Sequence, residues 1–158
     1  MPFQNSTSWV YTYYVDNDRK AVIFNSFGIL SSIFILLSGR LISQTAVDLL
    51  VQLFGALLIV WAVVTIRVSK HKKDLPPGYF YLTKGPYEII RHPVYTGYLL
   101  VMMSFVEIEF SLLRMIAFLI LCIVIFLKIT REDNTMIAEV NEYKEYKKKT
   151  KALIPYLL

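Results

Sequence analysis

The sequence is poor in cysteine and histidine, and this shortage removes several classes of function. Cys122 is the one cysteine among 158 residues, so no disulfide can form within the chain. The two histidines, His71 and His92, have no partners at the spacing of a metal site. The sequence also lacks a P-loop, a glycine-rich dinucleotide motif and a nucleophile elbow. We therefore predict no metal centre and none of these nucleotide or serine-hydrolase sites.

Charge is also scarce, and its distribution points to a membrane. Charged residues make up 18% of the chain and hydrophobic residues 56%, whereas soluble domains carry about 25% charged residues. The formal net charge is +5. Because the basic residues cluster beside apolar runs, membrane lipids rather than nucleic acid are the expected partners. Segment 1–20 lacks the order of a cleaved signal, so we expect the first apolar run to be a retained anchor.

Four uncharged runs organise the chain. Segments 21–39 and 49–66 hold 19 and 18 residues, enough to cross a bilayer as helices. Segments 93–106 and 115–127 are shorter and flank an acidic turn, which predicts a helical hairpin that either crosses or is re-entrant. The predicted fold class is an all-α polytopic membrane bundle of about four transmembrane helices, the last two a short hairpin, followed by a cytoplasmic C-terminal helix.

The basic residues predict which way this bundle faces. With both termini on one side, that side holds 15 of the 17 lysines and arginines, and Arg40 and Arg114 lie on the other. Such an excess predicts an integral, multi-pass protein with both termini cytoplasmic. We expect the side chain of Arg114 to extend to the far interface. The length fits a single domain, 1–158, with anchor helices in 1–66 and the catalytic portion in 67–158.

The tail after the last run is charged but periodic. Segment 131–158 is expected to continue the last crossing as a helix, which Pro155 ends. Six residues, spaced four, four, three, four and three apart, are expected on one stripe of this helix: Lys128, Glu132, Met136, Glu139, Tyr143 and Tyr146. Lys128 and Glu132 are one turn apart and suitably charged to pair.

A compact polar motif, residues 91–97, spans the junction of the basic loop 67–91 and the hairpin. Pro93 suits the first turn of a helix, which places His92 at the cap near free backbone N–H groups. A helix N-terminus favours anions, and Arg91 adds a charge suited to a carboxylate or phosphate. Gly97 allows another backbone or a ligand to approach closely. The same residues also suit an ordinary interfacial helix cap.

Taken together, GPYEIIRHPVYTGYLL and KITREDNTMIAEVNEYKEYKKKTKALIP resemble the isoprenylcysteine carboxyl methyltransferase family, membrane enzymes related to phospholipid N-methyltransferases. The resemblance covers residues 82–157. The positions that match the family pattern are Gly85, Pro86, Tyr87, Arg91, His92, Pro93, Tyr95, Gly97, Glu132, Glu142, Tyr143, Tyr146, Ile154 and Pro155. Lys128 and Asp133 depart from the family's Arg and Glu, and Lys lacks the bidentate fork of Arg. This departure puts the choice of substrate in doubt.

The resemblance implies S-adenosylmethionine as the methyl donor and carboxyl O-methylation of a lipophilic, isoprenylcysteine-type acceptor at the cytoplasmic membrane face. The catalytic residues it implies are Arg91, Lys128 and Glu132. The cofactor-binding residues it implies are Gly85, Pro86, Tyr87, His92, Pro93, Tyr95, Gly97, Glu132, Tyr143 and Tyr146. Tyrosine rings suit the sulfonium cation, Glu132 the amino group, and Arg91 with His92 the carboxylate of the donor.

Other acceptors and other functions remain open on the sequence. A phospholipid (ethanolamine) amine is one possible acceptor, for which Glu132 is the candidate base, and a small hydrophobic thiol is another. Membrane sterol reductases, which use NADPH, share a similar C-terminal RHP segment. A non-catalytic membrane subunit would bind neither cofactor. The sequence does not predict the oligomeric state.

Overall fold

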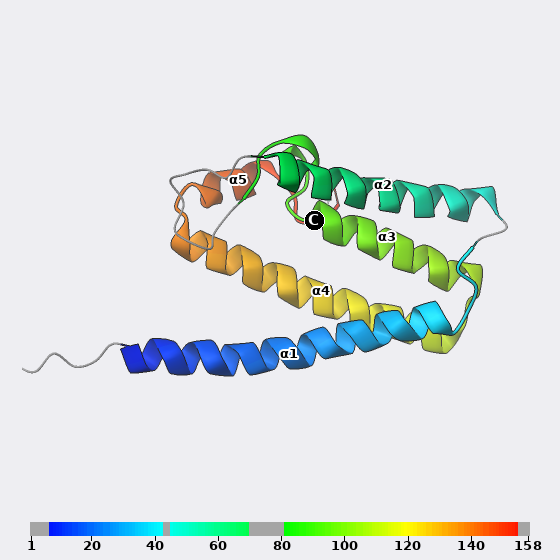
Figure 1. Ribbon diagram of the computed structural model, residues 1–158, viewed down its shortest axis with the longest axis horizontal. Helices are drawn as coiled ribbons and strands as arrows, with labels where there is room; N and C mark the ends of the chain where they lie inside the picture. The colour runs from blue at the N-terminus through cyan, green and yellow to red at the C-terminus, as the bar shows by residue number, and fades with distance from the viewer. Residues whose placement is uncertain (1–6, 43–44, 70–80, 155–158) are drawn as a thin grey trace, which may run out of the picture.

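The computed structural model describes residues 7–42, 45–69 and 81–154, with the backbone alone between 7 and 21. The described residues form α1 (Thr7–Leu37), α2 (Ala46–Val68), the 3-10 helix η1 (Gly85–Glu88), α3 (Pro93–Ile108), α4 (Leu112–Glu139) and α5 (Tyr143–Lys149) (Figure 1). An isolated parallel bridge joins Ile90 to Lys151. The all-α prediction is therefore confirmed for these ranges. His71 and Pro155, which figured in the sequence analysis, lie outside them.

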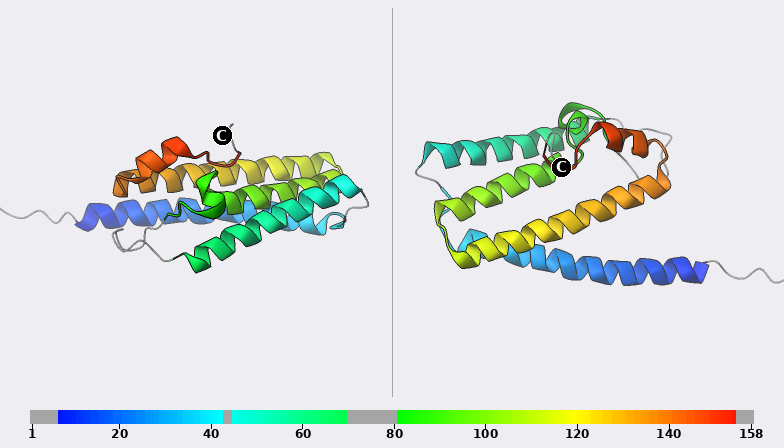
Figure 2. Two further views of the ribbon diagram at one scale, coloured as in Figure 1. Left: turned by 90° about the horizontal axis from the view of Figure 1, so that it is seen from above. Right: turned by 180° about the vertical axis from the view of Figure 1, so that it is seen from behind.

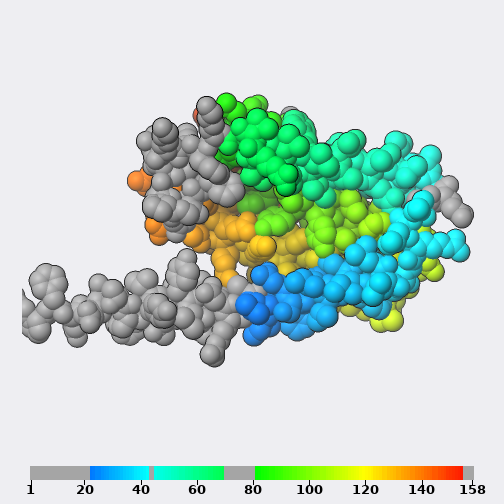
Figure 3. Space-filling model, viewed as in Figure 1, coloured from blue at the N-terminus to red at the C-terminus, as the bar shows by residue number. Residues whose placement is uncertain are grey.

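The four long helices lie side by side as two pairs. α2 packs along α3, α1 packs along α4, and fewer contacts join the pairs through α3. In Figure 3, α1 and α2 form the edges of the bundle with α3 and α4 between them. The α3–α4 turn, the end of α1 and the start of α2 lie at one end, here called the turn end (Figures 1 and 2). η1, the start of α3, α5 and the start of α1 lie at the other, the tail end.

Both helix pairs approach closely where small residues meet. A Cβ added to Gly97 in α3 would lie 2.6 Å from the carbonyl oxygen of Gly55 in α2. In the other pair, a Cβ on Gly28 would lie 3.1 Å from Val124. The hydroxyls of Ser32 and Tyr98, 2.5 Å apart, link α1 to α3. Small residues and hydroxyl hydrogen bonds of this kind are typical of helix contacts within membranes.

Within the part of the chain that the structure describes, two helices, α2 and α4, are long and apolar enough to cross a membrane, and the apolar parts of α1 and α3 are shorter. Large apolar side chains on the outer faces of the bundle are exposed, as in Leu50, Phe54 and Leu57 of α2. The buried core is small and lies between α1, α3 and α4; it consists of Ile35, Met102, Val106, Ala117, Leu121, Ile125 and Ile129. Such exposed apolar faces require an apolar environment.

The prediction that Arg114 extends to the far interface is wrong. Arg114 is 2% exposed, and its guanidinium donates to Ser38 Oγ at 3.2 Å and to the carbonyl oxygen of Phe105. The Phe105 carbonyl belongs to the last turn of α3, where carbonyls lack helical partners. A Cβ on Gly39 would lie 1.7 Å from Arg114 Nη1. Arg114 therefore caps the end of α3 beside the end of α1, and these contacts keep its side chain within the bundle.

The prediction of one continuous tail helix is also wrong. α4 does continue past the apolar run, through Lys128, Glu132 and Met136, but it ends at Glu139. Val140 is extended and 4% exposed, and it packs in a buried cluster with Tyr143 and Tyr146. Burial of these side chains outweighs continuation of a charged helix into solvent. Tyr143 and Tyr146 therefore lie on α5, which folds back across the tail end (Figure 1).

Candidate active site

Asp133 is the centre of a polar network that joins α4 to the start of α3 and to α5. Its Oδ2 lies 3.1 Å from Arg91 Nη2 and 3.3 Å from Lys147 Nζ. Its Oδ1 lies 3.1 Å from His92 Nε2 and accepts the hydroxyl of Tyr143 at 2.6 Å. The Asp133 side chain is 5% exposed and that of Arg91 7%. One buried carboxylate thus holds four side chains from two other segments of the chain.

Backbone hydrogen bonds reinforce this junction. The N–H groups of Arg91 and His92 donate to the carbonyls of Lys151 at 2.8 Å and Ala152 at 3.1 Å, and Lys151 donates back to Ile89 at 3.2 Å. These bonds pair the residues after α5 with the residues before α3. His92 is the N-cap of α3 and Pro93 its first residue, as the sequence predicts. The tail is therefore fastened beside the helix start that carries the polar motif.

The Arg91 guanidinium faces this junction. In addition to the contact of Nη2 with Asp133, Arg91 Nη1 donates to the carbonyl oxygens of Lys147, at 3.2 Å, and of Thr150. The Lys147 carbonyl lies in the last turn of α5, so Arg91 also caps the end of that helix. Arg91 Nε is buried without a hydrogen-bond partner. Nη1 and Nη2 of Arg91, which the sequence predicts to bind a carboxylate of the donor or the acceptor, are thus engaged within the protein.

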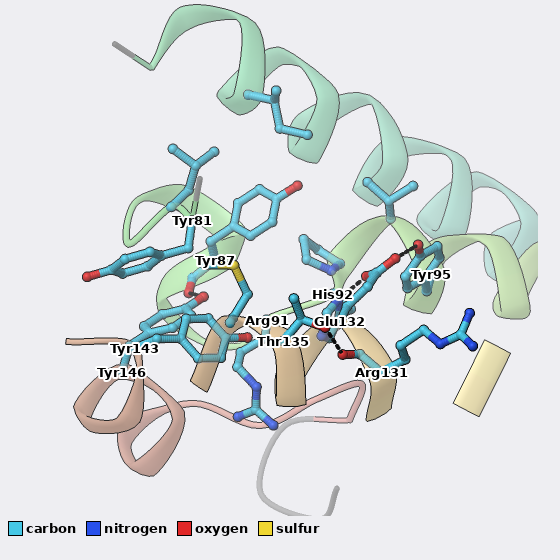
Figure 4. A pocket seen from close by; sticks show the side chains of 15 residues that line it. Tyr81, Tyr87, Arg91, His92, Tyr95, Arg131, Glu132, Thr135, Tyr143 and Tyr146 are labelled. Atoms are coloured by element: carbon cyan, nitrogen blue, oxygen red, sulfur yellow. Dashed lines mark hydrogen bonds and ion pairs between the residues drawn. The ribbon is translucent and has the colours of Figure 1, made fainter. Parts of the chain in front are cut away.

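A cavity of about 570 Å³ lies at the tail end between α4, α5, η1 and the start of α3 (Figure 4). Eight of the predicted site residues line it: Tyr87, Arg91, His92, Pro93, Tyr95, Glu132, Tyr143 and Tyr146. The remaining lining residues are Ile66, Tyr81, Leu82, Val94, Arg131, Thr135 and Met136. Ile66 belongs to α2, so the segment predicted as a plain anchor also contributes to the cavity. The size falls within the range of small-molecule sites.

The other four predicted site residues lie outside the cavity lining. Gly85 has φ +60°, which favours glycine, and packs near Thr65 of α2. Pro86 is fully buried, and Gly97 makes the close contact with α2 described above. Lys128 is exposed, forms no ion pair with Glu132 among the described residues, and places Nζ 5.3 Å from the ring centre of Tyr95. None of these four residues lines the cavity.

Glu132 lies in the cavity wall with one oxygen held by Tyr95. Tyr95 donates its hydroxyl to Glu132 Oε1 at 2.8 Å, and Oε2 lies 3.6 Å from His92 Nδ1. The rings of His92 and Tyr95 are stacked, with centres 5.7 Å apart. The Glu132 side chain is 41% exposed, in contrast to its buried neighbour Asp133. In Figure 4, His92, Tyr95 and Glu132 lie together on one side of the cavity.

Three tyrosines form the opposite side of the cavity. The ring centres of Tyr81, Tyr143 and Tyr146 lie 5.4–5.5 Å apart in each pair. Burial, followed by the hydrogen bond to Asp133, raises the pKa of Tyr143 above its ordinary value. Burial likewise raises the pKa of Tyr146, whose hydroxyl donates to the Tyr87 carbonyl at 2.7 Å. These phenols therefore keep their protons, and their ring faces can attract a cation.

Asp133 is the main site residue that the sequence analysis did not assign. The sequence places it with Lys128 and Glu132 at the end of the last crossing and marks it as a departure from the family's second Glu, without a role. A signal was present, because Leu121, Ile125, Ile129 and Asp133 are spaced by four and fall on the buried face of α4. A carboxylate on such a face requires buried donors. The partners of Asp133 on α5 are not predictable from the sequence, because its periodicity predicts a tail that continues α4 as one helix.

Comparison with known families gives one match. The sequence model of the isoprenylcysteine carboxyl methyltransferase (ICMT) family matches residues 46–138. The matched segment begins with α2 and ends within the last turn of α4. It includes His92, Tyr95 and Glu132 on one side of the cavity, whereas Tyr143 and Tyr146 of α5 lie beyond it. No curated protein and no solved structure matches the chain.

Proposed function

Because this chain belongs to the isoprenylcysteine carboxyl methyltransferase family, and is thus an integral membrane methyltransferase, we propose that it transfers a methyl group from S-adenosylmethionine to a carboxylate of a lipophilic, isoprenylcysteine-type acceptor. The observation that carries the proposal is the tail-end cavity, where eight residues of the family motifs converge. Motif residues contribute to both sides of the cavity, and the apolar outer faces of α2 and α4 are exposed beside it.

The chemistry of the lining suits the three charged groups of the donor. The rings of Tyr81, Tyr143 and Tyr146 suit a sulfonium cation. The carboxylate of Glu132 suits an ammonium group. Arg131 is a half-buried cation in the same wall, suited to a carboxylate of the donor or the acceptor. The cavity volume of about 570 Å³ is sufficient for a ligand of nucleoside size.

When bound, S-adenosylmethionine supplies a methyl group from its sulfonium, which becomes a thioether as the acceptor oxygen gains the methyl. A carboxylate nucleophile is ionised at neutral pH and requires no base. The protein therefore contributes mainly by positioning donor and acceptor in line and by excluding water. In this proposal Arg91 acts by holding α5 against the start of α3, Glu132 contacts the donor, and Lys128 lies at the rim over Tyr95.

We further propose a multi-pass topology with the tail end at the cytoplasmic face. The start of α1 and the whole of α5 lie at that end, in agreement with termini on a common side (Figure 2). The exposed lysines of α5, such as Lys144 and Lys148, lie there as well. The cavity would then open where soluble donor and membrane-bound acceptor can both reach it.

The test is a methyl-transfer assay with purified protein in detergent and methyl-labelled donor. The acceptors are a farnesylated N-acetylcysteine, a phosphatidylethanolamine and a hydrophobic thiol. We expect label in the first acceptor, released as methanol by mild base because a methyl ester hydrolyses. Base-stable label in the phospholipid would instead support N-methylation, and NADPH oxidation without transfer would support a reductase. Absence of transfer to any acceptor, with the donor unbound, would contradict the proposal.

A further inference from the structure

Asp133 also determines which ring nitrogen of His92, in the cavity wall, carries the proton. Oδ1 of Asp133 lies 3.1 Å from His92 Nε2 and also accepts the Tyr143 hydroxyl, while Oδ2 faces Arg91 and Lys147. Four donors around two oxygens require the carboxylate form, which only accepts hydrogen bonds. Nε2 can therefore approach Oδ1 only as N–H. In the neutral ring the single proton then lies on Nε2, and Nδ1 carries a lone pair.

Nδ1 faces the other carboxylate of the site. It lies 3.6 Å from Glu132 Oε2, too far for a good direct hydrogen bond. Glu132 Oε1 is held by the Tyr95 hydroxyl at 2.8 Å, which leaves Oε2 directed toward His92. Two acceptors at this separation allow one nitrogen to lie within hydrogen-bond distance of both. A group with several N–H donors and a positive charge, an ammonium, satisfies both atoms at once.

We propose that Asp133 is a positioning residue that keeps His92 in its Nε2–H form, so that His92 Nδ1 and Glu132 Oε2 together bind the ammonium group of the methyl donor. The assignment of the ammonium to the donor rests on the proposed function. His92 thereby moves from the carboxylate partner expected from the sequence to an ammonium partner. Asp133 itself does not line the cavity and acts through the ring.

The protonated nitrogen is measured directly by two-bond hydrogen–nitrogen correlation spectra of the full chain in detergent, with labelled histidine. The chain has two histidines, so His71→Gln leaves His92 as the single signal. In alkaline buffer we expect the proton on Nε2. The proposal is overturned if the proton lies on Nδ1 in this buffer, or if both ring nitrogens remain protonated in it. This readout needs neither donor nor activity.

Asp133→Asn gives a sharper outcome. Two cations face Oδ2, so the asparagine oxygen is expected to remain there and its amide NH2 to face Nε2. The proton of the ring then moves to Nδ1, as occurs when an aspartate that orients a histidine is replaced by asparagine. Tyr143→Phe and Lys147→Met are the matched controls, because each removes another partner of Asp133. Both controls should keep the Nε2–H form; a change of form in both would make the tail contacts, not Asp133, the determinant.

Ligand binding separates this proposal from the proposed function. The probes are S-adenosylhomocysteine and its analogue without the amino group. Asp133→Asn should weaken binding of the first by at least about tenfold and of the second by much less, since a hydrogen bond to a charged group is lost only in the first. Equal weakening of both probes overturns the ammonium site. Failure of the unmodified protein to bind either probe contradicts the donor assignment, whereas the Nε2–H form still tests the role of Asp133.

Discussion

The two ends of the bundle each bury an arginine, and the two arginines differ in their partners. Arg91 at the tail end faces the Asp133 carboxylate at 3.1 Å and caps α5. Arg114 at the turn end has hydroxyl and carbonyl partners, Ser38 and Phe105, and no ion pair in the part of the chain that the structure describes. A buried charge is costly without partners. One end therefore has a paired, carboxylate-centred network beside a cavity, and the other a cap that joins helix ends.

This difference indicates how stability and function are divided in the molecule. The tail-end network connects the residues that line the cavity, so changes there are expected to alter binding and transfer. The turn-end cap joins the ends of α1 and α3 to the start of α4, at the opposite end of the bundle from η1 and α5 (Figure 1), whose residues line the cavity. Changes there are expected to alter the free energy of unfolding while the folded protein keeps its activity.

The largest effect is expected for Arg91→Met. It removes one partner of a buried ion pair, which costs about 3–5 kcal/mol, and it releases α5 from the start of α3. Transfer per folded molecule should fall by about a hundredfold, because misplaced walls position the reactants poorly. Thermal unfolding in detergent and the methyl-transfer assay measure the two effects. Arg91→Lys keeps the charge and should be intermediate; stability and activity equal to the unmodified protein in Arg91→Met would refute the structural role of the pair.

Arg114→Met is expected to separate stability from activity. The loss of hydrogen bonds from a charged donor should cost about 1.5–3 kcal/mol of unfolding free energy. Transfer per folded molecule should remain within about twofold of the unmodified protein, because Arg114 lies at the end opposite the cavity. A twofold change corresponds to less than about 0.5 kcal/mol in the activation free energy. The same two measurements apply. A loss of activity as large as that of Arg91→Met would show that the two ends are not independent.

Gly39→Ala tests the cap from its other side. The added Cβ would lie 1.7 Å from Arg114 Nη1, so the guanidinium must move, at a cost of about 1–3 kcal/mol. In the Arg114→Met background the cost should be much smaller, because the methionine side chain ends before the guanidinium position. Unfolding free energies of the two single variants and the double variant give the coupling. Strictly additive costs would mean that Gly39 and Arg114 do not meet as described.

The smallest effect on the free energy of unfolding is expected when the pH is raised into the alkaline range, and we expect it only at the tail end. Burial raises the pKa of Tyr87, Tyr143 and Tyr146 in the folded protein. Their contribution to stability is therefore complete below the ordinary tyrosine pKa of about 10 and is lost as the pH rises above it. Tyr143→Phe should reduce this alkaline loss. Hydrogen exchange should increase in α5 before it increases around Arg114; the reverse order would contradict the comparison.

Part of this architecture follows from local sequence patterns. The apolar runs predicted the helices, and Pro93 and His92 predicted the start and cap of α3 because these preferences are local. Most of the cavity lining followed from the family resemblance. The break at Val140 was not predictable from periodicity, because it depends on burial of Val140 against α5. Arg114 was misjudged for the same reason, since its partner Phe105 is set by tertiary packing. The close backbone approach predicted at Gly97 is confirmed, but its partner, Gly55, is likewise set by packing.

The most direct test of the account is calorimetric binding of S-adenosylhomocysteine to two matched variants, one carboxylate at each end. Glu132 lines the cavity, whereas Glu109 at the turn end accepts the backbone N–H of Arg40 at 3.0 Å. Glu132→Gln should weaken binding by at least about tenfold, through loss of a charge-assisted hydrogen bond, and Glu109→Gln should leave the dissociation constant unchanged. Equal affinities in the two variants, or weaker binding in Glu109→Gln alone, would contradict the assignment of the tail-end cavity as the donor site.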